Sequence, residues 1–549
     1  MKFHITPFEG EVRTALERAR AMRLMERIRE RDHTVWKSDP AEISDRLGWL
    51  EAPENYLAHA RELKSFAAEY GRDRILLLGM GGSTLAPEVI RDICCARGGF
   101  AELKILDSTH PGAVLEAMQW AIPERTLFIS ATKSGGTVET LSFTRTFYRS
   151  LVSRMGARRA GDHFIAITDE GSGLHRLAES LGFRRIFLND PNTGGRYSAL
   201  SYFGLVPAAL IGADLESLLK RALAARNDPS ALELGVLMST LARLGRDKLT
   251  FLISPQLAPF GAWVEQLIAE STGKEGRGIL PVIDEPELPL QAYGADRFFL
   301  SMRLRGEEVR DGRLQALVRA GHPAVEIELN DRVELGAEFM RWELATAVAG
   351  AGLGINPFDQ PDVEAAKKLA REKVALYLRE RRLSDPEPDL EKGGISVFGD
   401  VRGATPEEAL RRFVEAAGRD AGSYLAVQAF LQPGLEVDRR LRELRRWIGG
   451  NLGIATTAGY GPRFLHSTGQ LHKGGSGRGF FVQLTATAER DAAIPDGVDS
   501  DASSMSFAVL ISAQAMGDRA ALEAAGRRVL RFHFRDGAAG LDRLIRALS

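Results

Sequence analysis

Short apolar runs alternate with stretches of helical periodicity along most of this chain. The run Ile75–Leu78 is followed by glycines and then by apolar residues at helical spacing, a pattern that predicts a strand, a turn and a helix. Strands separated by helices in this way predict a parallel sheet with helices on both faces. Further strands of this first set are predicted at 102–107, 126–131, 163–169 and 184–190.

A second set of elements begins with the predicted strand at 248–255. A segment rich in charge, proline and glycine at 381–394 has the composition of a linker, and a third set follows it. The predicted strands of the second and third sets lie at 297–304, 324–330, 394–400, 423–431, 479–486 and 528–535, with helices at 261–274, 404–417 and 435–449.

The sequence therefore predicts an α/β protein of three units. The first, at 1–235, holds one charged amphipathic helix over 11–35 and a doubly wound domain. The second doubly wound domain spans 236–385, and a smaller α/β domain at the C-terminus spans 392–549.

Composition narrows the class of protein. The chain has 549 residues, of which 44% are hydrophobic and 26% charged, as in ordinary globular proteins. A net charge of −1 gives no global attraction to nucleic acid or anionic membrane. Cys94 and Cys95 are adjacent on a predicted helix, which disfavours a disulfide and favours a reducing compartment. With no apolar signal core near the start, we expect a cytoplasmic enzyme or regulator.

Five hydroxyls, a lysine and two glycines stand where the strand at 126–131 gives way to a helix. Unpaired N–H groups and the helix dipole favour an anion there, and Thr132, Ser134 and Thr137 can donate to phosphate oxygens. Lys133 can add a charged contact. The junction thus predicts a phosphate site, with a helix cap that binds no ligand as the alternative. The NTP-binding motif Gly-x-x-x-x-Gly-Lys is absent.

A second glycine turn, with Gly81, Gly82 and Ser83, follows the strand at 75–78. It does not complete the dinucleotide motif G-x-G-x-x-G, because the sixth position is Thr84. Two loops at the carboxyl ends of parallel strands can face one crevice, where ligands of such sheets bind. We therefore expect both turns to bind one small phosphorylated ligand.

Five segments, in order, resemble motifs of the phosphoglucose isomerase family. They are GMGGSTLAP, TKSGGTVET, GGRYSALSYFGL, EQLIAESTGK and FDQPDVEAAK. The resemblance implies two sugar-isomerase domains and the reversible conversion of glucose 6-phosphate and fructose 6-phosphate through a cis-enediol. It implies no redox cofactor and no metal.

The same resemblance assigns roles to individual residues. It makes Glu270 the base that moves the proton, with Gln266 one helical turn earlier, and it places Arg196 and Lys367 in the active site. Without the resemblance, Glu270 would be interpreted as a solvated helix residue and Arg196 as an exposed loop residue. Burial would raise the pKa of a carboxyl base toward the working pH, and a fixed guanidinium would stabilise a developing oxyanion. Asp362 stands where the family motif has glycine.

The chain departs from the family at the histidine that helps to open the sugar ring. The matching stretch has Asp296 and Arg297 and no histidine. His322, His466 and His472 are the candidates. We expect the loop that carries His466 and His472 to fold over the active site, within one chain or across a dimer. The alternative is ring opening by water or Lys367, with the residues at 296 and 297 shaping the pocket.

The third unit has a narrower resemblance. The segments at 31–50 and 459–475 resemble the isomerase half of bacterial transaldolase/phosphoglucose isomerase fusions. A homodimer is implied by the family, although a third domain could replace subunit contacts. The loop could also bind a separate phosphate through Lys473, Gly474 and Gly475.

Two other functions compete with the leading one. The first is isomerisation of mannose 6-phosphate, because a preference between epimers depends on one or two pocket residues. The second is a sugar-phosphate sensor without catalysis, which the near-zero net charge and the retained glutamate disfavour.

Overall fold

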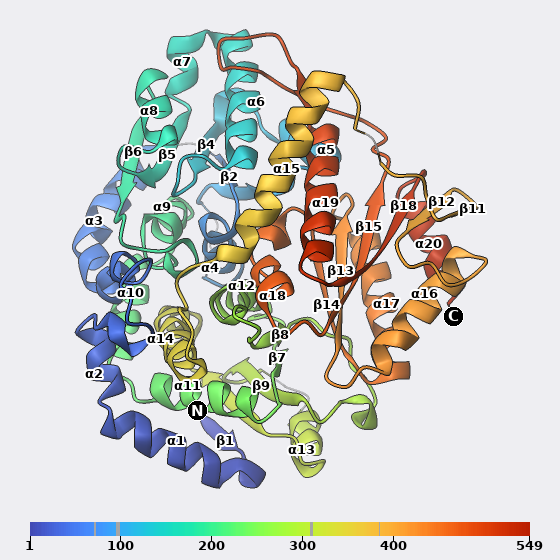
Figure 1. The fold of residues 1–549 in the computed structure, drawn as a ribbon. Helices are drawn as coiled ribbons and strands as arrows, with labels where there is room; N and C mark the ends of the chain where they lie inside the picture. Colours follow the sequence, from blue (N-terminus) through green and yellow to red (C-terminus); the bar gives the residue numbers. More distant parts are fainter. Residues whose placement is uncertain (71–72, 95–98, 308–310, 384, 549) are drawn as a thin grey trace.

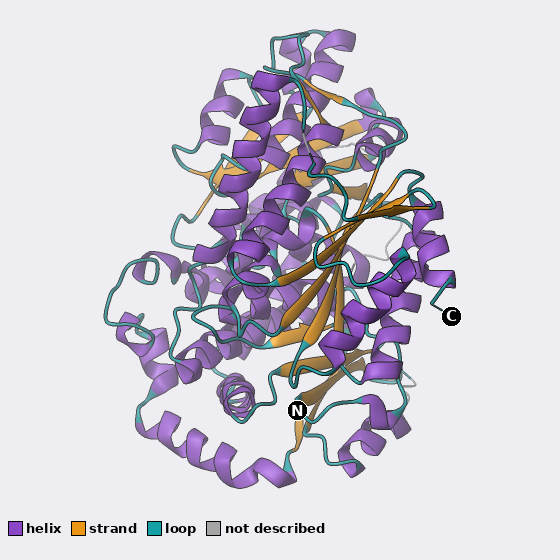
Figure 2. Cartoon of the chain, turned by 45° about the vertical axis from the view of Figure 1, so that its right-hand side comes forward, coloured by secondary structure: helices purple, strands orange, loops and turns teal. Residues whose placement is uncertain are grey.

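The computed structural model describes residues 1–549 apart from 71–72, 95–98, 308–310, 384 and 549. Three large β-sheets follow one another through the described residues, and helices enclose them (Figure 1; Figure 2). Most neighbouring strands in these sheets run parallel. The predicted class, two doubly wound parallel-sheet domains and a third smaller α/β domain, is confirmed.

The first sheet has the order β3-β2-β4-β5-β6 and is parallel throughout. The chain runs from β2 to β3 on one side and returns to β4 on the other, so the loops after β2 and β4 diverge at a switch point where ligands bind. Its elements are α3 (Ala52–Tyr70), β2 (Arg74–Gly79), α4 (Leu85–Cys94), β3 (Glu102–Leu106), α5 (Pro111–Trp120), β4 (Thr126–Ala131), α6 (Val138–Met155), α7 (Ala157–Gly161), β5 (Phe164–Asp169), α8 (Gly173–Ser180) and β6 (Arg185–Asn189).

The second sheet has the order β1-β10-β9-β7-β8, with β1 antiparallel at its edge. The N-terminal strand thus pairs with the second sheet, although the predicted division groups it with the first. The elements are β1 (Lys2–His4), α9 (Tyr202–Leu210), α10 (Leu215–Ala225), α11 (Ser230–Arg243), β7 (Lys248–Ile253), α12 (Phe260–Thr272), β8 (Leu280–Val282), β9 (Arg297–Leu304), α13 (Asp311–Arg319), β10 (Ala324–Leu329), α14 (Leu335–Leu353) and α15 (Pro361–Glu380).

The third sheet has the order β11-β12-β18-β15-β13-β14, of which the last four strands are parallel. Part of the predicted linker forms its edge strand β11. The elements are β11 (Leu390–Lys392), β12 (Ile395–Phe398), α16 (Pro406–Gly418), β13 (Tyr424–Phe430), α17 (Leu435–Leu452), β14 (Ala455–Tyr460), α18 (Gly469–Gly474), β15 (Gly479–Ala486), β16 (Ala493–Ile494), β17 (Met505–Ser506), α19 (Phe507–Ala524), β18 (Arg528–Phe534) and α20 (Ala538–Arg546).

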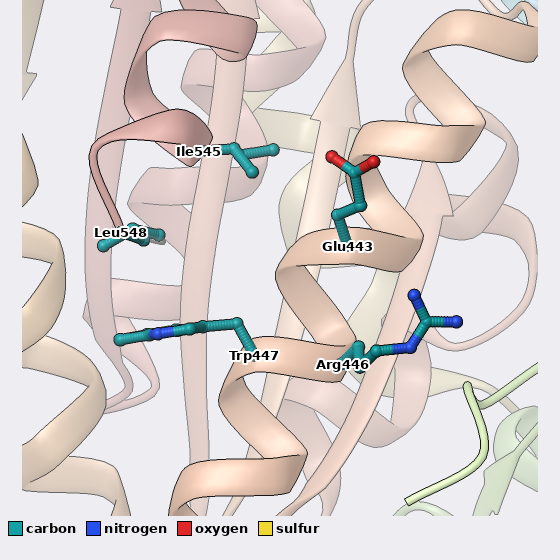
Figure 3. Close-up of a pocket in the computed structure, with 5 residues that line it drawn as sticks. All are labelled: Glu443, Arg446, Trp447, Ile545 and Leu548. Carbon is teal, nitrogen blue, oxygen red and sulfur yellow. The ribbon is translucent and has the colours of Figure 1, made fainter.

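A small pocket lies between α17 and α20 of this third unit (Figure 3). Figure 3 shows Trp447 on α17 extending toward Leu548, beyond the end of α20. Glu443, Arg446 and Ile545 complete the lining. None of the residues singled out from the sequence lines this pocket, so it marks a seam between two helices and is separate from the site described below.

The third unit docks closely on the helices that carry the predicted site. In Figure 1, α15 and α19 lie side by side at the centre of the molecule. Helix α18 packs on the end of α12, where a Cβ on Gly273 would lie 2.2 Å from the Cα of Leu471. Only glycine allows this approach. The three units therefore meet around α12 and α15.

The predicted helix at 11–35 is wrong in its extent. The structure has α1 (Glu9–Ala21) and α2 (Leu24–Arg29), separated at Arg23, whose φ of 51° is left-handed. This break turns the chain so that α2 buries its own apolar face, including Ile28. The predicted Cys94–Cys95 pair falls on α4, which is described as far as Cys94, and Cys95 lies outside the described residues. No helix in the described part of the chain is long and apolar enough to cross a bilayer.

Candidate active site

The two predicted glycine turns lie at the switch point of the first sheet. Gly79 at the end of β2 pairs with Ala131 at the end of β4, so the loops that follow are neighbours. Gly82 also contacts the turn that carries Arg196, since a Cβ there would lie 2.0 Å from the carbonyl oxygen of Gly195. Ser83 is buried in the same turn. The first sheet thus brings three of the five motifs to one edge.

Arg196 and Glu270 form an ion pair that joins the first sheet to the second. Arg196 Nη1 lies 3.2 Å from Glu270 Oε1, and their side chains are 3% and 14% exposed. Glu270 comes from α12, which follows β7 in the second sheet. The pairing places a fixed cation beside a carboxylate that retains some access to solvent.

Four further acceptors hold the Arg196 guanidinium. It donates to Ser271 Oγ at 2.8 Å and to Gln360 Oε1 at 2.9 Å. It also donates to the carbonyl oxygens of Pro357 and Asp359, at 2.7 and 2.9 Å. These bonds match the planar fork of an arginine, and they fix its orientation before any ligand binds.

Lys274, the last residue of the EQLIAESTGK motif, is a buried cation to which the family resemblance assigned no role. Its Nζ donates to the carbonyl oxygen and to Oδ1 of Asp359, both at 2.6 Å. Burial lowers the pKa of Lys274 to about 8, helped by the charge of Arg196 and opposed by Asp359 and Glu270. Asp359 therefore links Lys274 to the arginine of the site.

Gln266 connects Glu270 to the C-terminal unit. Its Nε2 donates to Glu270 Oε2 at 2.9 Å and to the backbone oxygen of His466 at 2.7 Å. Gly81 lies against the same groups, because a Cβ there would be 3.1 Å from Gln266 Nε2 and 3.0 Å from His466 Cβ. One amide thus bridges the glutamate and the predicted histidine loop.

The loop after β4 presents its hydroxyls at the start of α6. Thr132 and Thr137 share a hydrogen bond of 2.8 Å, and Ser134 Oγ accepts from the N–H of Gly136 at 3.3 Å. Lys133 instead pairs with Asp169 and donates to the Pro191 carbonyl. Because Asp169 offsets the charge of Lys133, the groups of this loop that could bind an anion are its hydroxyls and the N–H groups at the start of α6.

His466 reaches the first unit from the 3₁₀ turn Arg463–His466. Its Nε2 lies 3.0 Å from Oε1 of Glu139, in the first turn of α6. Burial raises the pKa of Glu139, but the charge and hydrogen bond of His466, with a smaller effect of Lys367, leave that pKa below its ordinary value. Glu139 belongs to the TKSGGTVET motif, which does not predict its pairing with His466.

The remaining predicted residues lie apart from this cluster. Lys367 on α15 is 36% exposed and pairs with Glu364 at 2.7 Å, so it contacts neither Glu270 nor Arg196. His472 is buried among Tyr424, Phe464 and Phe481. Burial, with the charges of Lys473 and Arg527, holds the pKa of His472 well below its ordinary value. Of the two histidines, the structure thus places His466 beside the predicted site residues and leaves His472 in an aromatic cluster.

The stretch at 291–300 faces the C-terminal unit. Arg297 is fully buried and forms two bonds to Glu285, of 2.9 and 3.0 Å. Asp296 lies 3.3 Å from Lys248, which donates to the Gly422 carbonyl. These side chains form ion pairs where the second unit meets the C-terminal unit, and they do not contact Glu270.

His322 and Lys473, two further candidates from the sequence, also have structural roles. His322 packs edge-on against Phe299, and its burial lowers its pKa. Lys473, suggested as a second phosphate ligand, is buried in an ion pair of 2.5 Å with Asp518. Neither side chain lies beside the cluster around Arg196.

Comparison with known proteins gives a consistent family. Residues 61–275 match the family model described as phosphoglucose isomerase. The glucose-6-phosphate isomerase of Streptococcus equi subsp. zooepidemicus is 31% identical over 392 residues, covering 59% of this chain and 86% of that protein. One from Streptococcus pyogenes is 29% identical over 396 residues, with the same coverage.

Solved structures agree on the fold. A hypothetical protein from Thermus thermophilus is 26% identical with a TM-score of 0.58, covering 68% of this chain and 99% of that one. A glucose-6-phosphate isomerase from Chlamydia trachomatis, at 18% identity and a TM-score of 0.56, covers 66% and 85% and supports the fold alone. The likeness to transaldolase fusions stays a prediction. The motifs, the clustered residues and these similarities show that the chain belongs to the phosphoglucose isomerase family and is an isomerase.

Proposed function

We propose that this chain interconverts glucose 6-phosphate and fructose 6-phosphate. The observation that carries the proposal is the 3.2 Å pair between Arg196 and Glu270, beside the loops after β2 and β4. A base and a fixed cation are what aldose–ketose isomerisation requires. The names of the matched relatives point to the same substrates.

In the proposed reaction, Glu270 removes the proton from C2 of the open-chain aldose. The C2–H electrons form a C1–C2 double bond, and the C1 carbonyl oxygen becomes an enediol oxygen whose charge Arg196 stabilises. The C1 oxygen takes up a proton and the C2 hydroxyl releases one, so that the net transfer is from O2 to O1. Protonated Glu270 then returns its proton to C1, and the carbonyl forms at C2. Gln266 holds Glu270 in position through its 2.9 Å bond. The sequence of steps is redox-neutral overall.

The phosphate of the substrate would bind at the start of α6. Thr132, Ser134 and Thr137 supply hydroxyls there, and the helix dipole favours an anion. Lys133 would contribute less than the sequence implied, because it pairs with Asp169. The turn of Gly81, Gly82 and Ser83 would form the adjoining wall.

His466 is proposed to open the sugar ring. It pairs with Glu139, and its backbone oxygen bonds the same Gln266 that holds Glu270. Lys367 lies near enough for its charge to act on Glu139, which leaves it a secondary role. One chain carries all of these groups, so the dimer implied by the family would not be needed to complete this site. A cytoplasmic location fits phosphorylated sugars as substrates.

The purified chain should be tested with fructose 6-phosphate and then mannose 6-phosphate, in D₂O. We expect formation of glucose 6-phosphate with deuterium exchange at the transferred position. Glu270→Gln should lose about 10³-fold in kcat, as for removal of a general base. Glu275→Gln is the matched control, since its exposed side chain pairs with Lys37 instead. Binding without turnover would indicate a sensor, and full activity of Glu270→Gln would refute the mechanism.

A further inference from the structure

One oxygen of the buried Glu139 carboxylate accepts hydrogen bonds from two directions. His466 Nε2 lies 3.0 Å from Oε1, and Gln514 Nε2 lies 2.7 Å from the same atom. Glu139 and Gln514 are each 4% exposed. Gln514 comes from α19, so the C-terminal unit supplies both donors to a carboxylate of the first unit.

The orientation of the Gln514 amide is set from its other end. The buried hydroxyl of Thr109, between β3 and α5, donates to Gln514 Oε1 at 2.7 Å. Reversing the amide would place its oxygen against the Glu139 carboxylate, and two acceptors repel. The hydroxyl and the carboxylate therefore select the same orientation, with the N–H pointing at Glu139.

We propose that Gln514 is a positioning residue that holds the Glu139 carboxylate where it fixes the orientation and tautomer of His466. This inference rests on the proposed ring-opening role of His466. An ionised carboxylate only accepts, so it selects the tautomer with a proton on Nε2 and leaves Nδ1 as the basic nitrogen. Gln514 steadies that carboxylate without bringing a charge of its own.

The charges around this group come from several elements. Lys367 on α15 acts on Glu139 together with His466, and both lower the pKa of that carboxyl against the effect of burial. When protonated, His466 also opposes the burial that raises the pKa of Asp107, which follows β3, and helps to lower the pKa of Glu364 on α15. Because these charges remain in a Gln514 variant, a change in pH dependence would report the lost hydrogen bond.

Gln514→Met keeps the length of the side chain and removes the donor. Loss of a hydrogen bond to the charged form raises a carboxyl pKa, so the acidic limb of kcat/KM should move upward by about 0.5 to 1 pH unit. At pH 7 we expect kcat/KM with cyclic fructose 6-phosphate to fall about tenfold. Thr109→Val, which removes only the orienting hydroxyl, should shift the profile in the same direction and by less.

Gln483→Met is the matched control. Gln483 is also buried, and it donates to the carbonyl of Ala515 in α19, the helix that carries Gln514, without contacting Glu139. Gln483→Met should lower the stability of the protein and leave the pH profile of kcat/KM unchanged. An unchanged profile in Gln514→Met and Thr109→Val, or an equal shift in Gln483→Met, would overturn the proposal.

A second measurement does not depend on activity. Nitrogen NMR of histidine-labelled protein, with His466 assigned by loss of its signals in His466→Asn, reports the tautomer directly. We expect the Nε2–H form in the wild type and a mixture in Gln514→Met. If the wild type bound sugar phosphate without isomerising it, this tautomer shift would still support Gln514. Identical tautomers in both proteins would refute its role whether or not the chain is active.

Discussion

Arg196 and Glu270 meet at 3.2 Å although they follow strands of different sheets, β6 and β7, and lie 74 residues apart (270 − 196). Arg196 is fixed by acceptors from α12 and from the segment before α15. Among the residues that the structure describes, Glu270 is held only by Gln266 besides the arginine. The cation is thus the rigid partner and the carboxylate the freer one, as expected for a group that must reach two neighbouring carbons.

Arg196→Lys should be costly for both stability and activity. Lysine cannot satisfy acceptors spread over four residues, so we expect a loss of about 2 to 4 kcal/mol in the free energy of unfolding. Without the fixed guanidinium, kcat should fall about 100-fold or more. Urea unfolding and steady-state kinetics measure the two effects.

Arg445→Lys separates these effects. Arg445 is buried and donates to the carbonyl oxygens of Ile283, Asp284 and Thr456. None of these acceptors belongs to the proposed catalytic pair. It should lose similar stability and keep its activity per folded molecule. Equal catalytic losses in both variants would contradict a specific role for Arg196.

The two histidines of the C-terminal loop should behave differently. His466→Ala removes the partner of Glu139 and should lower kcat with the cyclic sugar about 100-fold, the range of general acid–base groups. His472→Phe places an apolar ring among three aromatic neighbours and should keep kcat within about twofold. Wild-type turnover by His466→Ala would refute its ring-opening role.

Much of the fold could be predicted from local patterns. Strand β4 is apolar and fully buried, and the loop after it carries hydroxyls and glycines, so both the strand and its candidate ligand loop were recognisable. Strand β14, with the residues ATTAGY, lacks such a pattern. It forms because it pairs along its whole length with β13, a tertiary interaction that overrides local preference.

The candidate site was harder to predict where it depends on contacts between units. Glu139 and His466 lie 327 residues apart, and no periodicity relates them. Lys133 was predicted to add a charged phosphate contact because it stands in the hydroxyl-rich loop before a helix, but a partner on the next strand, Asp169, pairs with it. Sequence spacing identifies residues that share a loop, whereas partners supplied by other strands become visible only in the fold.

The stability of the protein should fall as pH rises through neutrality, because of Glu265. Burial raises the pKa of Glu265 from 4.5 to about 7, against the opposing charges of Arg445 and Arg463. Below pH 4.5 the folded and unfolded states both hold the proton. Between pH 4.5 and pH 7 only the folded state keeps the proton, so unfolding releases it and becomes more favourable as the pH rises. The free energy of unfolding therefore falls progressively, by up to about 3 kcal/mol.

Glu265→Gln should remove this dependence. Its free energy of unfolding, relative to that of the wild type, should increase by up to about 3 kcal/mol between pH 4.5 and pH 8. Denaturant titrations across that range measure the difference. Parallel curves for the two proteins would show that Glu265 titrates normally in the folded state.

Asp362, which stands where the family motif has glycine, is a docking point for the C-terminal unit. Its Oδ2 accepts from Gln470 Nε2 at 2.6 Å, and its N–H donates to Gln470 Oε1 at 3.0 Å. Asp362→Gly keeps the second bond and loses the first, so we expect about 1.5 to 3 kcal/mol of destabilisation. Activity should fall as well, because Gln470 follows His466 by four residues.

A double-mutant cycle with Gln470→Met isolates this contact. Gln470 is fully buried and also donates to the Gly273 carbonyl at 3.0 Å, so its loss alone should cost more than Asp362→Gly. If the two side chains act through each other, the double variant should be more stable than the sum of the single losses predicts, by about 1 kcal/mol or more. Asp362→Asn, which keeps an acceptor oxygen without the charge, should lie between wild type and glycine. Additive losses would mean that the aspartate stabilises α15 through the helix dipole alone, and the departure from the family motif would then be unrelated to the added domain.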